Sequence, residues 1–240
     1  MKYNIVTVLN ESYKDFGKLF VASAFENIDL NNVAKIYVFD VGLSEETKNY
    51  LEEFPRVEVV ATEIKTESNN IHDEGWKKST YSKTRFLLDV LIRDGIPTVM
   101  VDSDCIFVRE FWDILEFGDF DIVATGRTRQ GFSKHIGSFF AANNASKKTL
   151  SFMQRWIDNL EELQKNQNIK HAESPALSKT IEEMKSELEI LVVPERVVSA
   201  IGLFPESRIL HLKSDHYAKT IQERLSLPYA QYFVKAYLRT

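Results

Sequence analysis

The sequence predicts an α/β fold, with one domain built on a mostly parallel twisted sheet flanked by helices. Short apolar, β-branched runs alternate with segments whose apolar residues recur at helical spacing. This β-α-β-α-β order is typical of parallel strands joined by crossover helices. The length of 240 residues suffices for one large core, and the sequence contains no internal repeat or convincing linker that would divide it.

The opening of the chain supplies the first three strands of this sheet. They are expected over residues 4–9, 35–39 and 56–61, where the side chains are apolar or alternate in polarity. Residues 16–27 form a helix between the first two strands. Asp40 closes the second strand and is expected to shape the following loop, and Ser44 is placed to cap the next helix.

The rest of the chain continues the pattern after a polar stretch, residues 62–79, that is expected to be a loop. A helix over 81–92 ends at Gly95 and Pro97, and an apolar strand over 98–101 stops abruptly at an acidic turn. The later elements are expected as strands over 121–125, 137–142, 188–193 and 208–212 and as helices over 147–164 and 178–187.

Composition limits the kind of protein. The formal net charge of −5 argues against a general nucleic-acid binder, which needs a basic surface. Cys105 is the single cysteine, so no internal disulfide is possible, as in a reducing compartment. The first residues lack the pattern of a signal peptide, and no apolar run approaches the ~20 residues of a transmembrane helix. We therefore expect a cytoplasmic protein; the aromatic segment 229–238 either covers the sheet or makes peripheral contact with the inner face of a membrane.

The sequence Asp102-Ser103-Asp104 carries the chemistry. It directly follows the strand over 98–101, at the edge where open α/β sheets place their ligands. Two carboxylates this close repel each other, and burying them without a partner is costly. A hard divalent cation with oxygen ligands resolves the conflict and can neutralise a diphosphate leaving group. An isolated Asp-x-Asp is more often two solvated aspartates at a loop, so the surrounding sequence has to decide.

That surrounding sequence resembles the retaining galactosyltransferase and glycogenin-like glycosyltransferases. The resemblance rests on Ile5-Val6 followed by Asn10, Ser12 and Tyr13, on the run from Val38 to Glu46, on Arg85 lying 17 positions before Asp102, and on His211 late in the chain. It implies the GT-A fold, with residues 1–108 as the nucleotide-binding half and 109–240 as the acceptor half.

The resemblance also implies roles for particular residues. Asp102, Asp104 and His211 would hold Mn²⁺ or Mg²⁺, and the imidazole favours Mn²⁺. Glu173 would be the catalytic carboxylate facing the reacting sugar. The residues implied to contact the nucleotide sugar are Val8, Asn10, Tyr13, Arg85, Ser103, Lys213 and Lys219. Among them, Tyr13 would stack on the base, and Lys213 or Lys219 would neutralise the diphosphate.

The acceptor half departs from the family. His135-Ile136-Gly137 stands where the family has Asn-Ala-Gly, Glu173-Ser174 stands for an Asp-Gln pair, and no glycine separates His211 from Lys219. These changes leave the acceptor, the donor sugar and the stereochemical outcome open. The expected reaction moves a hexose from a nucleotide-diphosphate sugar, with UDP as the expected carrier, to a glycan or other hydroxyl acceptor, and retention follows from the resemblance alone.

Plainer interpretations and other functions remain open at this point. Arg85 has an alternative partner in Asp89, Glu173 has an alternative interpretation as an ordinary loop or helix-start carboxylate, and His216 is a second choice of metal ligand. One rival function is an inactive GT-A-fold module that binds sugar nucleotides. Another is a haloacid-dehalogenase-type phosphatase, but its Asp-x-Asp normally opens the fold, and its later aspartate pair is not evident here.

Overall fold

In a computed structural model, the described part of the chain comprises residues 2–66, 74–116, 120–128, 133–166, 171–200, 202–212 and 220–238. The strands are β1 (Tyr3–Leu9), β2 (Val33–Asp40), β3 (Val57–Ala61), β4 (Thr98–Val101), β5 (Cys105–Phe107), β6 (Ile122–Gly126), β7 (His135–Ala142), β8 (Ile190–Pro194), β9 (Val198–Ser199) and β10 (Ile209–His211). The helices are α1 (Lys14–Asn27), α2 (Glu45–Glu52), α3 (Glu74–Asp94), α4 (Asp113–Glu116), α5 (Lys147–Gln164), α6 (Glu173–Met184), α7 (Ile221–Leu225) and α8 (Pro228–Tyr237), with short 3₁₀ turns at Glu11–Tyr13 and Leu30–Asn32.

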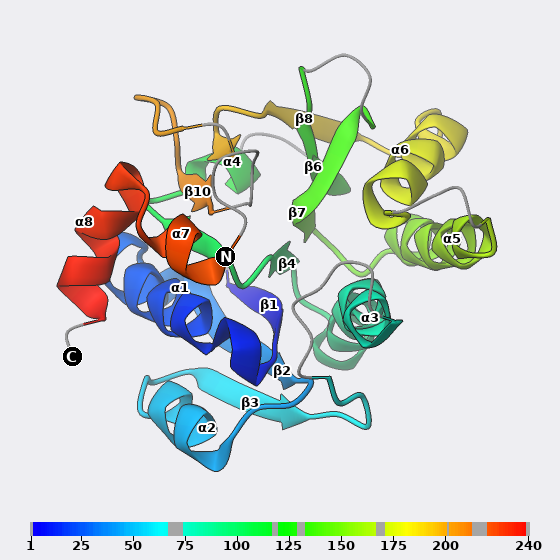
Figure 1. Cartoon of the computed structure of the whole chain (residues 1–240). Coiled ribbons are helices and arrows are strands. Elements are labelled where there is room, and N and C mark those ends of the chain that lie inside the picture. The colour runs from blue at the N-terminus through cyan, green and yellow to red at the C-terminus, as the bar shows by residue number, and fades with distance from the viewer. Residues whose placement is uncertain are drawn as a thin grey trace.

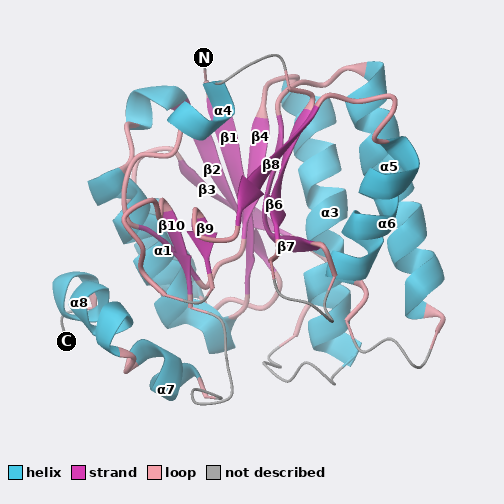
Figure 2. Cartoon of the chain, turned by 90° about the horizontal axis from the view of Figure 1, so that it is seen from above, coloured by secondary structure: helices cyan, strands magenta, loops and turns pink. Residues whose placement is uncertain are grey.

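The expected α/β architecture is confirmed. A seven-stranded sheet has the order β3-β2-β1-β4-β7-β6-β8, in which β7 alone runs antiparallel to its neighbours. Figure 2 shows α3, α5 and α6 on one face of this sheet, with α1, α8 and the smaller sheet on the other. Because β1, β2, β3 and β4 run parallel to one another, their carboxyl ends lie at one common edge of the sheet.

Each face of the sheet has its own apolar core, because successive strand residues point to opposite sides. Met100 and Phe140 face the α3–α5–α6 layer, where Phe152 and Trp156 of α5 are fully buried against them. Val99, Val101 and Phe139 face the other way, toward α1. Packing on both faces holds β4 in place, and this fixes the position of the acidic turn that follows it.

A three-stranded sheet in the order β5-β10-β9 lies beside the main one. Its strand β5 begins directly after the acidic turn, and β10 pairs antiparallel to β5. One side of this small sheet contributes Ile106, Leu210 and Leu212 to a third core, shared with Phe16 of α1 and Phe233 of α8. Figure 1 shows α8 alongside α1, with α7 following β10.

Most predicted elements are present, with shifted ends. Ser44 caps α2 as expected, accepting a hydrogen bond from the Thr47 amide at 3.2 Å. The expectation that residues 74–79 belong to a loop is wrong: α3 begins at Glu74, and its first turns are polar, so they carry no apolar periodicity. Similarly, α6 begins at Glu173 rather than at 178, because Pro175 fits the first turn of a helix. Among the described helices, none has both the length and the apolar character needed to cross a membrane.

Candidate active site

The acidic turn lies between β4 and β5 and is held in place by the backbone. The amide of Asp102 donates to the Ser138 carbonyl of β7 at 3.0 Å, and the amide of Cys105 donates to the Asp102 carbonyl at 3.0 Å. Both aspartate side chains are largely buried, and Ser103 between them is half-buried. The sheet therefore presents two carboxylates at the carboxyl end of a central strand, as the sequence predicted.

The small sheet brings His211 to these carboxylates. His211 lies directly opposite Cys105 in the antiparallel pairing of β10 and β5. Its Nε2 atom is 3.1 Å from Oδ1 of Asp104 and 3.8 Å from Oδ2 of Asp102. Within the described residues, its buried Nδ1 atom has no hydrogen-bond partner. His211 thus lies within 4 Å of a carboxylate oxygen of each predicted aspartate ligand, although 107 positions separate Asp104 from His211 in the sequence.

This donor set fits a divalent cation. Two carboxylates and one imidazole are the ligand types that Mn²⁺ accepts in proteins. Asp104, Cys105 and His211 each offer one ligand atom, and these atoms lie within 4.8 Å of one another. Cys105 is fully buried, and burial raises the pKa of its thiol, so the carboxylates and the imidazole are the better ligands at neutral pH.

A buried lysine that sequence analysis did not identify joins the site. Lys83 of α3 donates to Oδ1 of Asp102 and lies 2.8 Å from Oε1 of Glu173, and its side chain is only 7% exposed. Burial alone would lower the pKa of Lys83, but the two carboxylates outweigh it and raise that pKa, so the amine stays charged. Lys83 lies four positions before the buried Leu87, and a lysine on the apolar stripe of a helix was the available sequence signal.

Glu173, the predicted catalytic carboxylate, lies at this site. It is the first residue of α6, and its side chain rests against Gly137 of β7. A Cβ atom at Gly137 would lie 2.8 Å from Cδ of Glu173, so a side chain there would displace the carboxylate. The glycine thus makes room for Glu173, and Lys83 connects it to Asp102.

A second cation, Arg224 of α7, contacts the other aspartate. Its Nη2 atom donates to Oδ2 of Asp104, its Nε atom donates to the Leu212 carbonyl, and its Nη1 atom lies 3.4 Å from the hydroxyl of Tyr13. The guanidinium also lies 4.5 Å from the ring centre of Phe16. Burial would raise the pKa of Asp104, but His211 and Arg224 outweigh burial and hold that pKa well below its usual range.

The predicted nucleotide-binding residues are only partly brought together. Val8 and Asn10 are buried at the end of β1, and Tyr13 lies beside Arg224. Arg85 is elsewhere: its side chain is 56% exposed and pairs with Glu161 of α5, not with Asp89. The predicted Lys213 and Lys219, and the second-choice ligand His216, lie outside the described residues.

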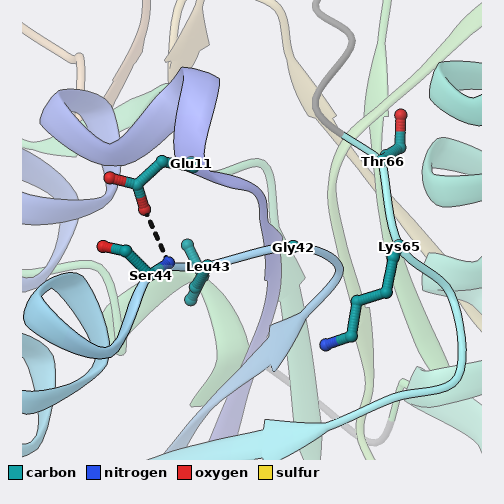
Figure 3. Close-up of a pocket in the computed structure, with 6 residues that line it drawn as sticks. All are labelled: Glu11, Gly42, Leu43, Ser44, Lys65 and Thr66. Carbon is teal, nitrogen blue, oxygen red and sulfur yellow. Dashed lines mark hydrogen bonds between the residues drawn. The ribbon is translucent and has the colours of Figure 1, made fainter.

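A depression of about 520 Å³ lies at the same edge of the sheet, where β1, β2 and β3 end. Figure 3 shows Glu11 and Ser44 on one side of the Gly42–Leu43 turn and Lys65 on the other. The Glu11 carboxylate accepts from the Ser44 amide at 2.8 Å, and Lys65 pairs with Asp40 at 2.9 Å. Asp40 also accepts from the amides of Gly42 and Leu43, so it shapes this loop as expected. The charged groups lining the depression already have protein partners.

Fold and site together define a nucleotide-sugar enzyme of the α/β class. The family profile of nucleotide-diphospho-sugar transferases matches residues 45–225, three quarters of the chain. The chain belongs to this family, and it has the GT-A fold of glycosyltransferases. Comparison with curated protein sequences finds no match.

Three solved structures share the fold. The galactosyltransferase LgtC, solved with donor and acceptor sugar analogues, has a TM-score of 0.65 at 10% identity, covering 99% of this chain and 97% of LgtC. The bifunctional glycosyltransferase WbbM has a TM-score of 0.62 at 14% identity, covering 99% of this chain and 52% of WbbM. The glycosyltransferase GlyE of Streptococcus pneumoniae TIGR4 has a TM-score of 0.60 at 14% identity, covering 99% of this chain and 63% of GlyE. At these sequence identities, the similarity supports a shared fold and nothing more.

Proposed function

We propose that this glycosyltransferase is metal-dependent and moves a hexose from a nucleoside diphosphate sugar, with UDP as carrier, to a hydroxyl group of a glycan or similar acceptor. The observation that carries the proposal is the approach of His211 to both Asp102 and Asp104 at the carboxyl end of β4. An ion held by these three residues would neutralise the charge that develops on the departing diphosphate.

The chain's own residues bind and orient the donor in this proposal. Asn10 and Tyr13 meet the base at the end of β1, and Ser103 lies against the ribose. Glu173 faces the donor sugar and pairs with Lys83, whose amine lies 2.8 Å away. Lys83 also fixes the orientation of Asp102. The acceptor hydroxyl forms the new bond to the anomeric carbon as the bond to the diphosphate breaks.

We further propose that the reaction retains the anomeric configuration, with the acceptor proton passing to an oxygen of the leaving phosphate. The acceptor attacks from the side that the diphosphate leaves, so no protein base is required for that proton. Glu173 then stabilises the positive charge that develops on the sugar ring. The anomer of the product, measured by NMR, decides between retention and inversion.

A thermal-shift screen tests the function. UDP, GDP, CDP and ADP are each added with Mn²⁺, Mg²⁺ or EDTA, because a ligand that binds the native state raises the melting temperature by mass action. We expect a shift with UDP that requires Mn²⁺. Asp104→Asn should remove this metal-dependent shift, while Asp158→Asn on the exposed face of α5 should keep it. Metal-independent binding in both variants would contradict the metal site.

One observation favours a second candidate function, a sugar-nucleotide-binding module without turnover. Lys83 and Arg224 already neutralise the two aspartates, as they would in a site that needs no metal. Such a module would bind UDP equally well in EDTA and would not hydrolyse a UDP-sugar. Release of UDP from UDP-glucose or UDP-galactose in the presence of Mn²⁺ separates the enzyme from the module.

A further inference from the structure

Arg224 occupies a position that conflicts with a metal ion on Asp104. Its side chain is 5% exposed, and its guanidinium is anchored by Asp104, by the Leu212 carbonyl and by the aromatic face of Phe16. Asp104 therefore serves two groups at once, since Oδ1 faces His211 and Oδ2 faces the guanidinium. A dication bound by Asp104 beside this buried positive charge is strongly repelled, because charge interactions weaken little in a buried site.

The backbone that carries Arg224 is firmly held, so the side chain rather than the helix has to respond. Thr220 and Glu223 form a capping box at the start of α7. Leu225 at its end packs in the third core with Phe233 of α8, and Gln231 donates to the Leu225 carbonyl at 2.6 Å. An arginine side chain on such an anchor can exchange partners by rotating its flexible stem.

A nucleoside diphosphate offers the partner that the guanidinium would exchange for Asp104. The planar fork of arginine binds phosphate oxygens in the bidentate manner in which it binds a carboxylate. Arg224 also touches Tyr13, both at the hydroxyl and over the ring at 5.6 Å, and Tyr13 is the proposed contact of the base. One side chain therefore links a metal ligand to the nucleotide side of the site.

We propose that Arg224 is a built-in counter-ion of Asp104 in the free protein and a diphosphate ligand in the nucleotide complex. This inference rests on the proposed function. Its consequence is that the metal alone binds weakly, and that metal and nucleoside diphosphate bind cooperatively because the nucleotide takes over the guanidinium. By linkage, each ligand raises the affinity for the other by the same factor.

The test measures Mn²⁺ binding directly, by the loss of the free Mn²⁺ signal in electron paramagnetic resonance, with and without saturating UDP. In the wild-type protein, UDP should tighten Mn²⁺ binding at least tenfold, which corresponds to about 1.4 kcal/mol. Arg224→Gln should bind Mn²⁺ alone at least fivefold more tightly than wild type, and UDP should then add less than threefold. Arg208→Gln removes a more exposed ion pair, 2.7 Å long, with Asp113, which does not involve the aspartates of the turn. This control should behave like wild type.

Two neutral variants keep the test decisive. Gln retains a donor for the Leu212 carbonyl, and Arg224→Met retains an apolar stem against Phe16; circular dichroism identifies which of them is folded. If a folded variant binds Mn²⁺ no more tightly than wild type while wild type shows UDP-dependent Mn²⁺ binding, the role of Arg224 is wrong and the proposed function stands. If wild type binds no Mn²⁺ with UDP or with GDP, the proposed function itself fails, and this inference fails with it.

Discussion

Lys83 Nζ lies 2.8 Å from Oε1 of Glu173 and at the same time contacts Asp102, so one buried amine joins the acidic turn after β4 to the first turn of α6. The two carboxylates come from opposite halves of the sequence, and both are mostly buried. The positive charge between them offsets the repulsion between the two carboxylates.

Replacing Lys83 by Met should therefore destabilise the protein by about 3 kcal/mol, because two buried carboxylates lose their counter-ion. Urea unfolding near neutral pH measures the loss. Lys179→Met, which breaks a more exposed pair with Glu162, should destabilise the protein much less, because solvent screens that pair. An equal loss in both variants would contradict the central role of Lys83.

The low pKa of Asp104 predicts a specific acid response. A carboxyl group whose pKa is lowered on folding stabilises the native state above its unfolded pKa, with a reference value of 3.8, and loses that contribution as the pH falls toward the folded pKa. The stability difference between wild type and Asp104→Asn should therefore be constant near neutral pH and should narrow below pH ~4. Denaturant unfolding from pH 7 to pH 3 in metal-free buffer measures it. Asp158→Asn is the control for removing one exposed carboxylate. If the stability difference between wild type and Asp104→Asn instead widens in acid, the lowered pKa of Asp104 is contradicted.

The sequence was informative where local pattern determines structure. Asp102 and Asp104 follow an apolar strand, and the carboxyl end of a parallel strand faces the ligand edge, so their location could be predicted from periodicity alone. His211 was found through the family resemblance. Its approach to Asp104 depends on the antiparallel register of β10 with β5, and β5 has only three residues, too few to give a strand signal.

Lys83 and Arg224 were missed for a different reason. Both are basic residues on helices, where a solvated position is the ordinary expectation, and their burial depends on tertiary contacts. Arg85 was predicted because its spacing from Asp102 matched the family, and Lys83 was not considered. The structure turns the side chain of Arg85 toward Glu161 and gives the buried position to Lys83. Two positions along a helix amount to about 200° of rotation, so the two side chains face nearly opposite ways.

Replacing Gly137 by Ala should separate binding from turnover. The added methyl group would meet Cδ of Glu173 at 2.8 Å, so the carboxylate must move away from the proposed sugar position. We expect donor hydrolysis and transfer to fall at least tenfold, about 1.4 kcal/mol of transition-state stabilisation, while Mn²⁺-dependent binding of UDP stays within twofold. Ser138→Ala, a change of similar size at the next residue of β7, should leave the rate nearly unchanged. If the Gly137→Ala enzyme keeps the normal rate, Glu173 does not contact the substrate.

Arg85→Met tests whether Arg85 binds the donor, as the family resemblance implies, or only forms the surface ion pair seen in the structure. Arg85 pairs with Glu161 at the surface of α3 and α5, and both side chains are at least half exposed, so the pair should contribute less than about 1 kcal/mol to stability. Because this guanidinium does not belong to the Asp102–Lys83–Glu173 cluster, the variant should bind UDP and Mn²⁺ as wild type does. Isothermal titration of UDP in the presence of Mn²⁺ makes the comparison, with Lys83→Met as the variant expected to lose affinity. A tenfold loss in Arg85→Met would mean that the side chain leaves Glu161 and reaches the donor when the nucleotide binds. An unchanged affinity would assign the donor-side cation of α3 to Lys83.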